Sequence, residues 1–250
     1  MWRVTLTVGI ALLAGCSGFL PAGPTAGDSD PVTPAPVPNS SADVTVAVPT
    51  SDGTVEVERL LDRHERALST RSFHRHVEQA GPQNTLDVWL DRERGVWRVR
   101  RRFGPISDDV VLADGTVYTN VRDDPDTPYA ATPATSNTSL VASPAGVNLL
   151  RGLLSNTEYR QVDSFRWNGR PVAVLTPTET VETPTAADGS KIELSQLYVD
   201  RQGVIRYVEH AERRPDRPDI GATMTVTTDI DRVPIPWWLE EDDPYSSGSM

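Results

Sequence analysis

The first apolar pattern in the chain with helical spacing lies between Val57 and Leu68. Val57, Leu60, Leu61 and Leu68, with His64 in the same row, form one narrow stripe at three- and four-residue intervals. Glu56 and Glu58 stand at the start of this stretch, where the helix dipole favours acidic side chains. The pattern predicts a helix that lays one face on a core.

A second helical pattern follows Ser143-Pro144, a pair typical of a helix start because Ser is a good N-cap and Pro fits the first turn. Its apolar stripe is broader and consists of Val147, Leu149, Leu150, Leu153 and Leu154. We expect this helix to be more buried than the first.

The remaining chain alternates apolar and polar residues over short runs that are separated by turn residues, which predicts antiparallel hairpins. The turns are Arg92–Gly95, Asp114-Gly115, Asn168-Gly169 and Arg201–Gly203. Strands are expected at 72–80, 85–91, 96–103, 110–112, 116–121, 158–167, 172–176, 192–200, 204–212 and 222–230. Residues 123–142 are expected to be a loop.

The order of the elements is helix, hairpins, helix, hairpins. Consecutive hairpins favour one antiparallel sheet, and two apolar helices favour packing on one of its faces. The predicted class is α+β: a strongly curved antiparallel sheet, an unclosed barrel of about 8–10 strands, with two helices on its concave face.

The N-terminus has the pattern of an export signal. Arg3 precedes an apolar run from Val4 to Leu13, which is too short to span a bilayer. The segment Leu13-Ala14-Gly15-Cys16 resembles a lipoprotein lipobox, and this resemblance implies cleavage before Cys16 and lipidation of its sulfur. The alternative is an ordinary secretory signal with a chance cysteine. Cys16 is the sole cysteine, so an intramolecular disulfide is excluded.

These patterns divide the chain into four predicted parts. Residues 1–15 are the signal peptide, 16–50 carry the lipidated Cys16 and a disordered Pro/Ser/Thr linker, 51–238 form a single α+β domain, and 239–250 are an acidic disordered tail. Asn39 and Asn137 begin N-glycosylation sequons, which makes both candidate glycosylation sites.

The charge pattern indicates a salt-adapted protein. The formal net charge is −11, and Lys191 is the only lysine. This composition resembles that of proteins from salt-loving archaea, where screening tolerates an acidic excess; a GC-rich bacterium is the alternative. Net acidity argues against nucleic acid as a partner.

The fold pattern resembles the lipoprotein-carrier fold of periplasmic lipoprotein carriers and mycobacterial lipid-binding lipoproteins. The resemblance covers roughly residues 54–232 and rests on the element order and on the hairpin Leu197–Ile205, with its Asp-x-x-Gly turn. It implies an apolar cavity between sheet and helices. The candidate lining residues are those of the two helical stripes: Leu60, Leu61, His64, Leu68, Leu149, Leu150, Leu153 and Leu154.

Other candidate chemistry is sparse. His74 and His76 share one face of a strand, but a zinc site needs a third ligand, so we expect no metal.

His64 is expected to be a core histidine bonded to a backbone carbonyl, with a cavity-lining role as the alternative. The cluster Arg98, Arg100, Arg101 and Arg102 is expected to pair with acidic residues on a solvated strand face; anionic headgroups are the alternative partner. The sequence lacks GxSxG, SxxK, P-loop, GxGxxG and HExxH motifs, so we expect no catalytic residues, no cofactor and no enzyme.

The expected function is that of a lipoprotein anchored through Cys16 to the extracytoplasmic face of the cell membrane. Its domain would be a non-enzymatic binding module for a lipid or other hydrophobic ligand. The alternative is an envelope scaffold or accessory protein that binds another surface protein, for which an exposed Trp237-Trp238 pair would be the contact.

Overall fold

The structure is a computed structural model that describes residues 44–79, 83–121, 129–135, 138–154, 157–178, 191–215 and 218–242. The chain divides into two compact units, residues 1–39 and 40–250, and all the described residues belong to the second unit. The predicted signal peptide, Cys16, Asn39 and Asn137 lie outside the described residues. Within the described part of the chain, the two helices are too short or too polar to span a bilayer.

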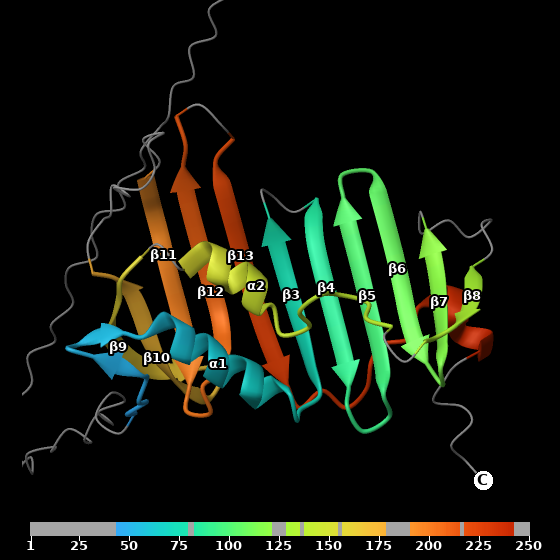
Figure 1. The fold of residues 1–250 in the computed structure, drawn as a ribbon, viewed down its shortest axis with the longest axis horizontal. Coiled ribbons are helices and arrows are strands. Elements are labelled where there is room, and N and C mark those ends of the chain that lie inside the picture. The colour runs from blue at the N-terminus through green and yellow to red at the C-terminus, as the bar shows by residue number, and fades with distance from the viewer. Residues whose placement is uncertain are drawn as a thin grey trace, which may run out of the picture. The chain divides into compact units, whose positions relative to one another are not determined.

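One antiparallel sheet of 11 strands forms the body of the described unit, in the order β8-β7-β6-β5-β4-β3-β13-β12-β11-β10-β9 (Figure 1). The strands are β3 (Phe73–Gln79), β4 (Asn84–Asp91), β5 (Val96–Phe103), β6 (Ile106–Ala113), β7 (Thr116–Val121), β8 (Ala130–Pro133), β9 (Tyr159–Trp167), β10 (Arg170–Pro177), β11 (Lys191–Asp200), β12 (Ile205–Arg213) and β13 (Ile220–Thr228). The sheet does not close, because β8 and β9 are edge strands. The predicted fold class is therefore confirmed.

The sheet has one strand more than the sequence predicted. β8 lies within residues 123–142, where the sequence favoured a loop, and it pairs with β7 from Thr116↔Pro133 to Thr119↔Ala130. All four residues of β8 are exposed, so this strand has no alternating pattern that could reveal it. A separate two-stranded pair, β1 (Thr50–Ser51) and β2 (Thr54–Val55), precedes the first helix.

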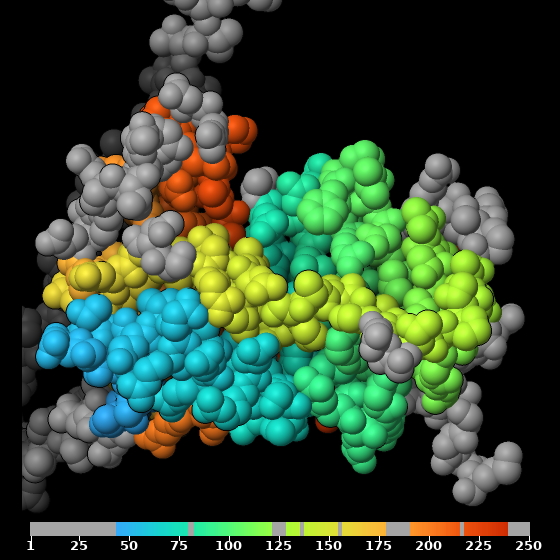
Figure 2. Space-filling view, in the orientation of Figure 1, coloured from blue at the N-terminus to red at the C-terminus, as the bar shows by residue number. Residues whose placement is uncertain are grey.

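Both helices, α1 (Val57–Leu68) and α2 (Val147–Leu154), lie on the same face of the sheet, in front of β3 and β9–β13 (Figure 1). Figure 2 shows them side by side over this half, with the segment before α2 continuing across the neighbouring strands. α2 begins at Val147 rather than at Pro144, because Gly146 adopts a left-handed conformation with φ +81°. The side-chain oxygen of Ser143 still accepts a hydrogen bond from the Val147 backbone N–H, at 3.0 Å.

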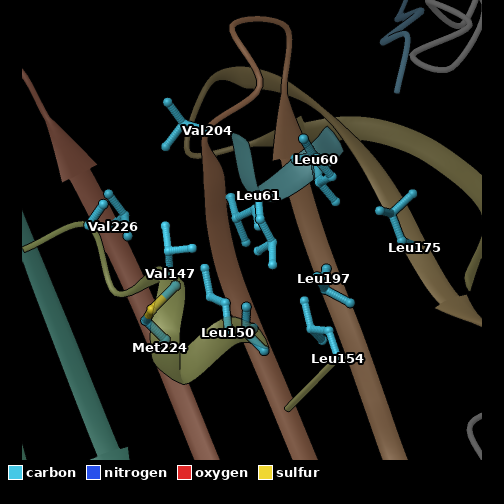
Figure 3. Close-up of a cluster of buried hydrophobic side chains, with 14 of the residues drawn as sticks. Leu60, Leu61, Val147, Leu150, Leu154, Leu175, Leu197, Val204, Met224 and Val226 are labelled. Atoms are coloured by element: carbon cyan, nitrogen blue, oxygen red, sulfur yellow. The ribbon is translucent and has the colours of Figure 1, made fainter. Parts of the chain in front are cut away.

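The main core lies between the helices and the sheet (Figure 3). Leucines of α1 and α2 point toward apolar side chains of β10–β13, among them Leu175, Leu197 and Met224. This packing is the expected consequence of one apolar stripe on each helix facing one apolar face of the sheet.

The folded unit extends beyond the predicted bounds of 51 and 238. At the N-terminal side, Val44 and Val46 are buried in the main core, because alternate residues of this extended segment point inward. At the C-terminal side, Leu239 is 1% exposed and belongs to a second core on the other face of the sheet. That second core includes Val96, Val111, Ala113, Val233 and Trp238, and the 3-10 helix η1 (Trp237–Asp242) contributes to it.

Candidate functional site

The predicted lining residues lie in or against the main core between the helices and the sheet. Leu60, Leu61, Leu68, Leu150 and Leu154 are at most 1% exposed, while Leu149 and Leu153 are partly buried against the same core. Of the eight residues, Leu149 also borders a cavity. A role in lining a lipid cavity remains a prediction for the other leucines, which pack against core side chains.

His64 holds three segments of the fold together. It is fully buried; its Nε2 lies 2.9 Å from the Ala145 carbonyl oxygen, and its Nδ1 accepts the Ile205 backbone N–H at 3.1 Å. This pattern requires Nε2–H as the donor and a neutral ring. Burial lowers the pKa of His64 to about 4, which agrees with a neutral imidazole. His64 is therefore the core histidine, bonded to a backbone carbonyl, that the sequence favoured.

A cavity of about 120 Å³ lies between α2 and strands β3, β4 and β5. Its apolar wall consists of Val77, Leu86, Phe103 and Leu149, and its polar wall of Arg75, Gln79, Asn84 and Thr85. An engineered cavity of about 150 Å³ in another protein admits benzene, so this volume is enough for a small apolar group. Phe103 is 47% exposed, which places the open side of the cavity at the end of β5.

Arg75 is the most unusual group at this cavity. Its side chain is 3% exposed, and its Nη1 donates to the Ser143 carbonyl oxygen at 3.1 Å. Its Nε has no hydrogen-bond partner among the described residues, and none of their carboxylates forms an ion pair with it. Burial lowers the pKa of Arg75 to about 10, which still leaves the guanidinium charged at neutral pH. A buried cation without an anionic partner is costly, and a bound anion would relieve that cost.

Sequence reasoning missed Arg75, although a signal for it was present. Arg75 alternates with His74 and His76 and so shares the inward face of β3 with Phe73 and Val77, both of which are in the main core. An arginine at an inward position of an apolar strand indicates either a buried ion pair or a ligand.

The segment before α2 closes this face of the sheet over β3 to β5. Arg101 donates to the Leu140 carbonyl oxygen at 2.7 Å and pairs with Asp108 at 3.0 Å. Arg98 points to the opposite face, where both Asp109 oxygens accept its Nε and Nη2 at 2.9 and 2.6 Å. The arginine cluster is therefore split between two faces. These two members pair with acidic residues, as the sequence favoured, but Arg98 and Asp109 are buried rather than on the expected solvated strand face.

The tryptophan pair is also split. Trp238 is 9% exposed and packs near Tyr129, whereas Trp237 is 49% exposed. Only Trp237 is free to contact a partner.

Comparison with known proteins finds no matching family model and no matching curated sequence. Among solved structures, LprF from Mycobacterium bovis aligns with 72% of this chain and 96% of its own, at 11% identity and a TM-score of 0.40. MucB in the Pseudomonas aeruginosa MucA/MucB complex aligns with 72% of this chain and 59% of its own, at 18% identity and a TM-score of 0.36. At these values the two structures transfer neither a family nor a function to this chain.

Proposed function

We propose that this protein is a lipid-anchored, extracytoplasmic binding protein without enzymatic activity, and that its cavity next to α2 holds part of an anionic amphiphile. The apolar wall takes the hydrocarbon portion and Arg75 pairs with the anionic group. The single observation that carries the proposal is a buried, charged Arg75 at the wall of an apolar cavity, with no carboxylate partner among the described residues.

The small volume supports partial insertion of the ligand. About 120 Å³ accepts a short length of chain, so the rest of the ligand leaves through the open side at Phe103. A ligand bound in this way is accessible from solvent and can be exchanged without unfolding the main core.

Binding of dodecanoate and of dodecanol tests both halves of the proposal. Leu149→Trp fills the cavity and is expected to abolish binding of both probes. Val162→Trp is the matched control, because Val162 is 48% exposed on β9, away from the cavity, and binding should be unchanged. Arg75→Gln should weaken dodecanoate at least about tenfold and leave dodecanol unaffected, since a hydrogen bond to a charged group contributes about 1.5–3 kcal/mol. Equal binding by the two tryptophan variants would refute the cavity as the site.

The anchor is tested separately. The variant Cys16→Ser removes the thiol that lipidation needs, and it should move the protein from the membrane fraction to the medium. A Cys16→Ser protein that stays with the membrane would refute the anchor and leave the cavity proposal intact.

A protein partner is the second candidate function, and the exposure of Trp237 favours it. A truncation that removes residues 234–250 would not test this contact alone, because it would also remove Trp238 and Leu239 from the second core. Trp237→Ala leaves that core in place. If the partner hypothesis holds, this variant loses the envelope protein that cross-links to the wild type in intact membranes, and its ligand binding stays unchanged.

A further inference from the structure

Two histidines and an aspartate meet on the face of the sheet opposite α1 and α2. Phe73 and Val77 of β3 point into the main core, so His74 and His76 point to the other face. Their cross-strand partners on β4 are Trp89 and Asp87, respectively. The Oδ1 of Asp87 lies 2.8 Å from His74 Nε2 and 2.8 Å from His76 Nδ1.

We propose that His74, His76 and Asp87 form a three-ligand site for Zn²⁺. One donor atom from each of the three side chains lies within 4.8 Å of the others. Zinc–ligand bonds of about 2.0–2.2 Å place the donor atoms of a tetrahedral ion about 3.3 Å apart. Small side-chain rotations would therefore bring the three donor atoms to the spacing that an ion needs. The ion would take the place of the two N–H protons that now lie between the histidine rings and the Asp87 carboxylate.

Neighbouring groups orient two of the ligands. The His74 ring stacks on Trp89 at a centroid distance of 4.6 Å and an interplanar angle of 4°. The other nitrogen of His76, Nε2, lies 3.3 Å from Glu78 Oε1. A carboxylate on the far nitrogen of a ligand histidine fixes its tautomer and raises its basicity, and this is a common arrangement at zinc sites.

Charged groups of both signs surround the site. Glu78 adds a carboxylate beside His76, whereas Arg100 on β5 is the cross-strand partner of Asp87 and Arg98 lies over the Trp89 ring at 5.1 Å. The proposal therefore rests on the geometry and the chemistry of the three ligands.

The ligand set and its exposure decide which ions fit. Two imidazole nitrogens and one carboxylate suit Zn²⁺, Ni²⁺ or Cu²⁺, whereas Mg²⁺ and Ca²⁺ prefer oxygen alone. The side chains of His74, His76 and Asp87 are 29%, 30% and 17% exposed, so an ion can enter and a fourth coordination position faces solvent. The sequence argued against a metal for lack of a third ligand, and register alone brings Asp87 to the histidine pair.

Calorimetric titration of Zn²⁺ at about pH 8, above the ordinary histidine range, tests the proposal. The full chain carries Cys16→Ser throughout, so that the sole thiol cannot act as a ligand. We expect one saturable site, weakened at least about tenfold by His74→Gln, His76→Gln or Asp87→Asn and by a smaller factor in Glu78→Gln. Glu209→Gln is the matched control, because Glu209 occupies the same face two strands from Glu78 but is outside the cluster.

Co²⁺ gives a readout that needs no substitution of a ligand. A site with three protein ligands should show intense visible bands of four- or five-coordinate Co²⁺ and should broaden the ring signals of His74 and His76, while those of buried His64 and His210 shift less. Absence of saturable Zn²⁺ binding would overturn the proposal, as would binding that survives all three ligand substitutions.

Discussion

Protonation of His64 should dominate the acid sensitivity of this fold. The neutral ring donates to Ala145 and accepts from Ile205, so it ties α1 to the segment before α2 and to the start of β12. A second proton on Nδ1 would turn that acceptor into a donor facing the Ile205 N–H. It would also place a cation in the core, near Arg75 and Arg206, which both lower the pKa of His64.

The magnitude follows from the pKa shift. Burial is the largest cause of the decrease from 6.5 to about 4, and each pKa unit corresponds to about 1.4 kcal/mol, so the shift is worth about 3 kcal/mol. Because the folded pKa is depressed, the unfolded chain binds the proton first. The contribution is therefore fully present above pH 6.5, is lost as pH falls toward about 4, and is constant below that.

Denaturant unfolding at a series of pH values, at one fixed salt concentration, measures this effect. The comparison protein is His64→Gln, whose side-chain N–H can still donate to Ala145 but does not titrate. At pH 7 the variant should be less stable by about 1–3 kcal/mol, because the Ile205 N–H loses its acceptor. Other groups with shifted pKa, such as His76 and His210, are present in both proteins and cancel in the difference.

The expected outcome is a stability difference that shrinks by about 3 kcal/mol between pH 7 and pH 4, until the variant equals or exceeds the wild type. Curves that remain parallel over this range would refute the reasoning, because they would mean that His64 is not held neutral by burial.

Three further substitutions, two of them with a matched control, test the fold by the same unfolding measurement. Gly146→Ala should lower the free energy of unfolding by more than about 1 kcal/mol, because Gly146 has φ +81° and an added Cβ would lie 2.2 Å from Arg75 Nη1. Gly152→Ala within α2 is the control: its added Cβ would have no atom within 4 Å, so this variant should be neutral or stabilising. Asp200→Asn should cost about 3–5 kcal/mol, because it leaves buried Arg206, 2.7 Å away, without its charge partner; Asp108→Asn, at a partly exposed pair, should cost about 0–1 kcal/mol. Leu239→Ala should lower the free energy of unfolding by about 2–5 kcal/mol, because Leu239 is buried in the second core. A change near zero would contradict this burial and place Leu239 in a tail.

Local chemistry explains why most elements were predictable. Asp114-Gly115 and Asn168-Gly169 both adopt positive φ at both residues, which is the hairpin geometry that these pairs favour. In the Asp-x-x-Gly turn, Asp200 Oδ1 accepts the N–H groups of Gln202 and Val204, so this turn is likewise stabilised within a few residues. His64 was predictable because its place in an apolar stripe leaves backbone groups as its partners.

The functional candidates were harder to predict because they depend on contacts between distant segments. The carboxylate at the histidine pair depends on the register of β3 with β4, in which a shift of one residue would turn Asp87 to the other face. The cavity at Arg75 depends on where α2 and the segment before it come to lie on the sheet.

The sequence by itself determined the hairpins, both helices and the side of each strand that is apolar, because periodicity and turn chemistry act over a few residues. Only the tertiary structure decided that β3 pairs with β13, that β8 extends the sheet and that Val44 and Leu239 belong to cores. Those outcomes depend on which apolar surfaces cover one another across many residues, and residue patterns along one chain do not specify that choice.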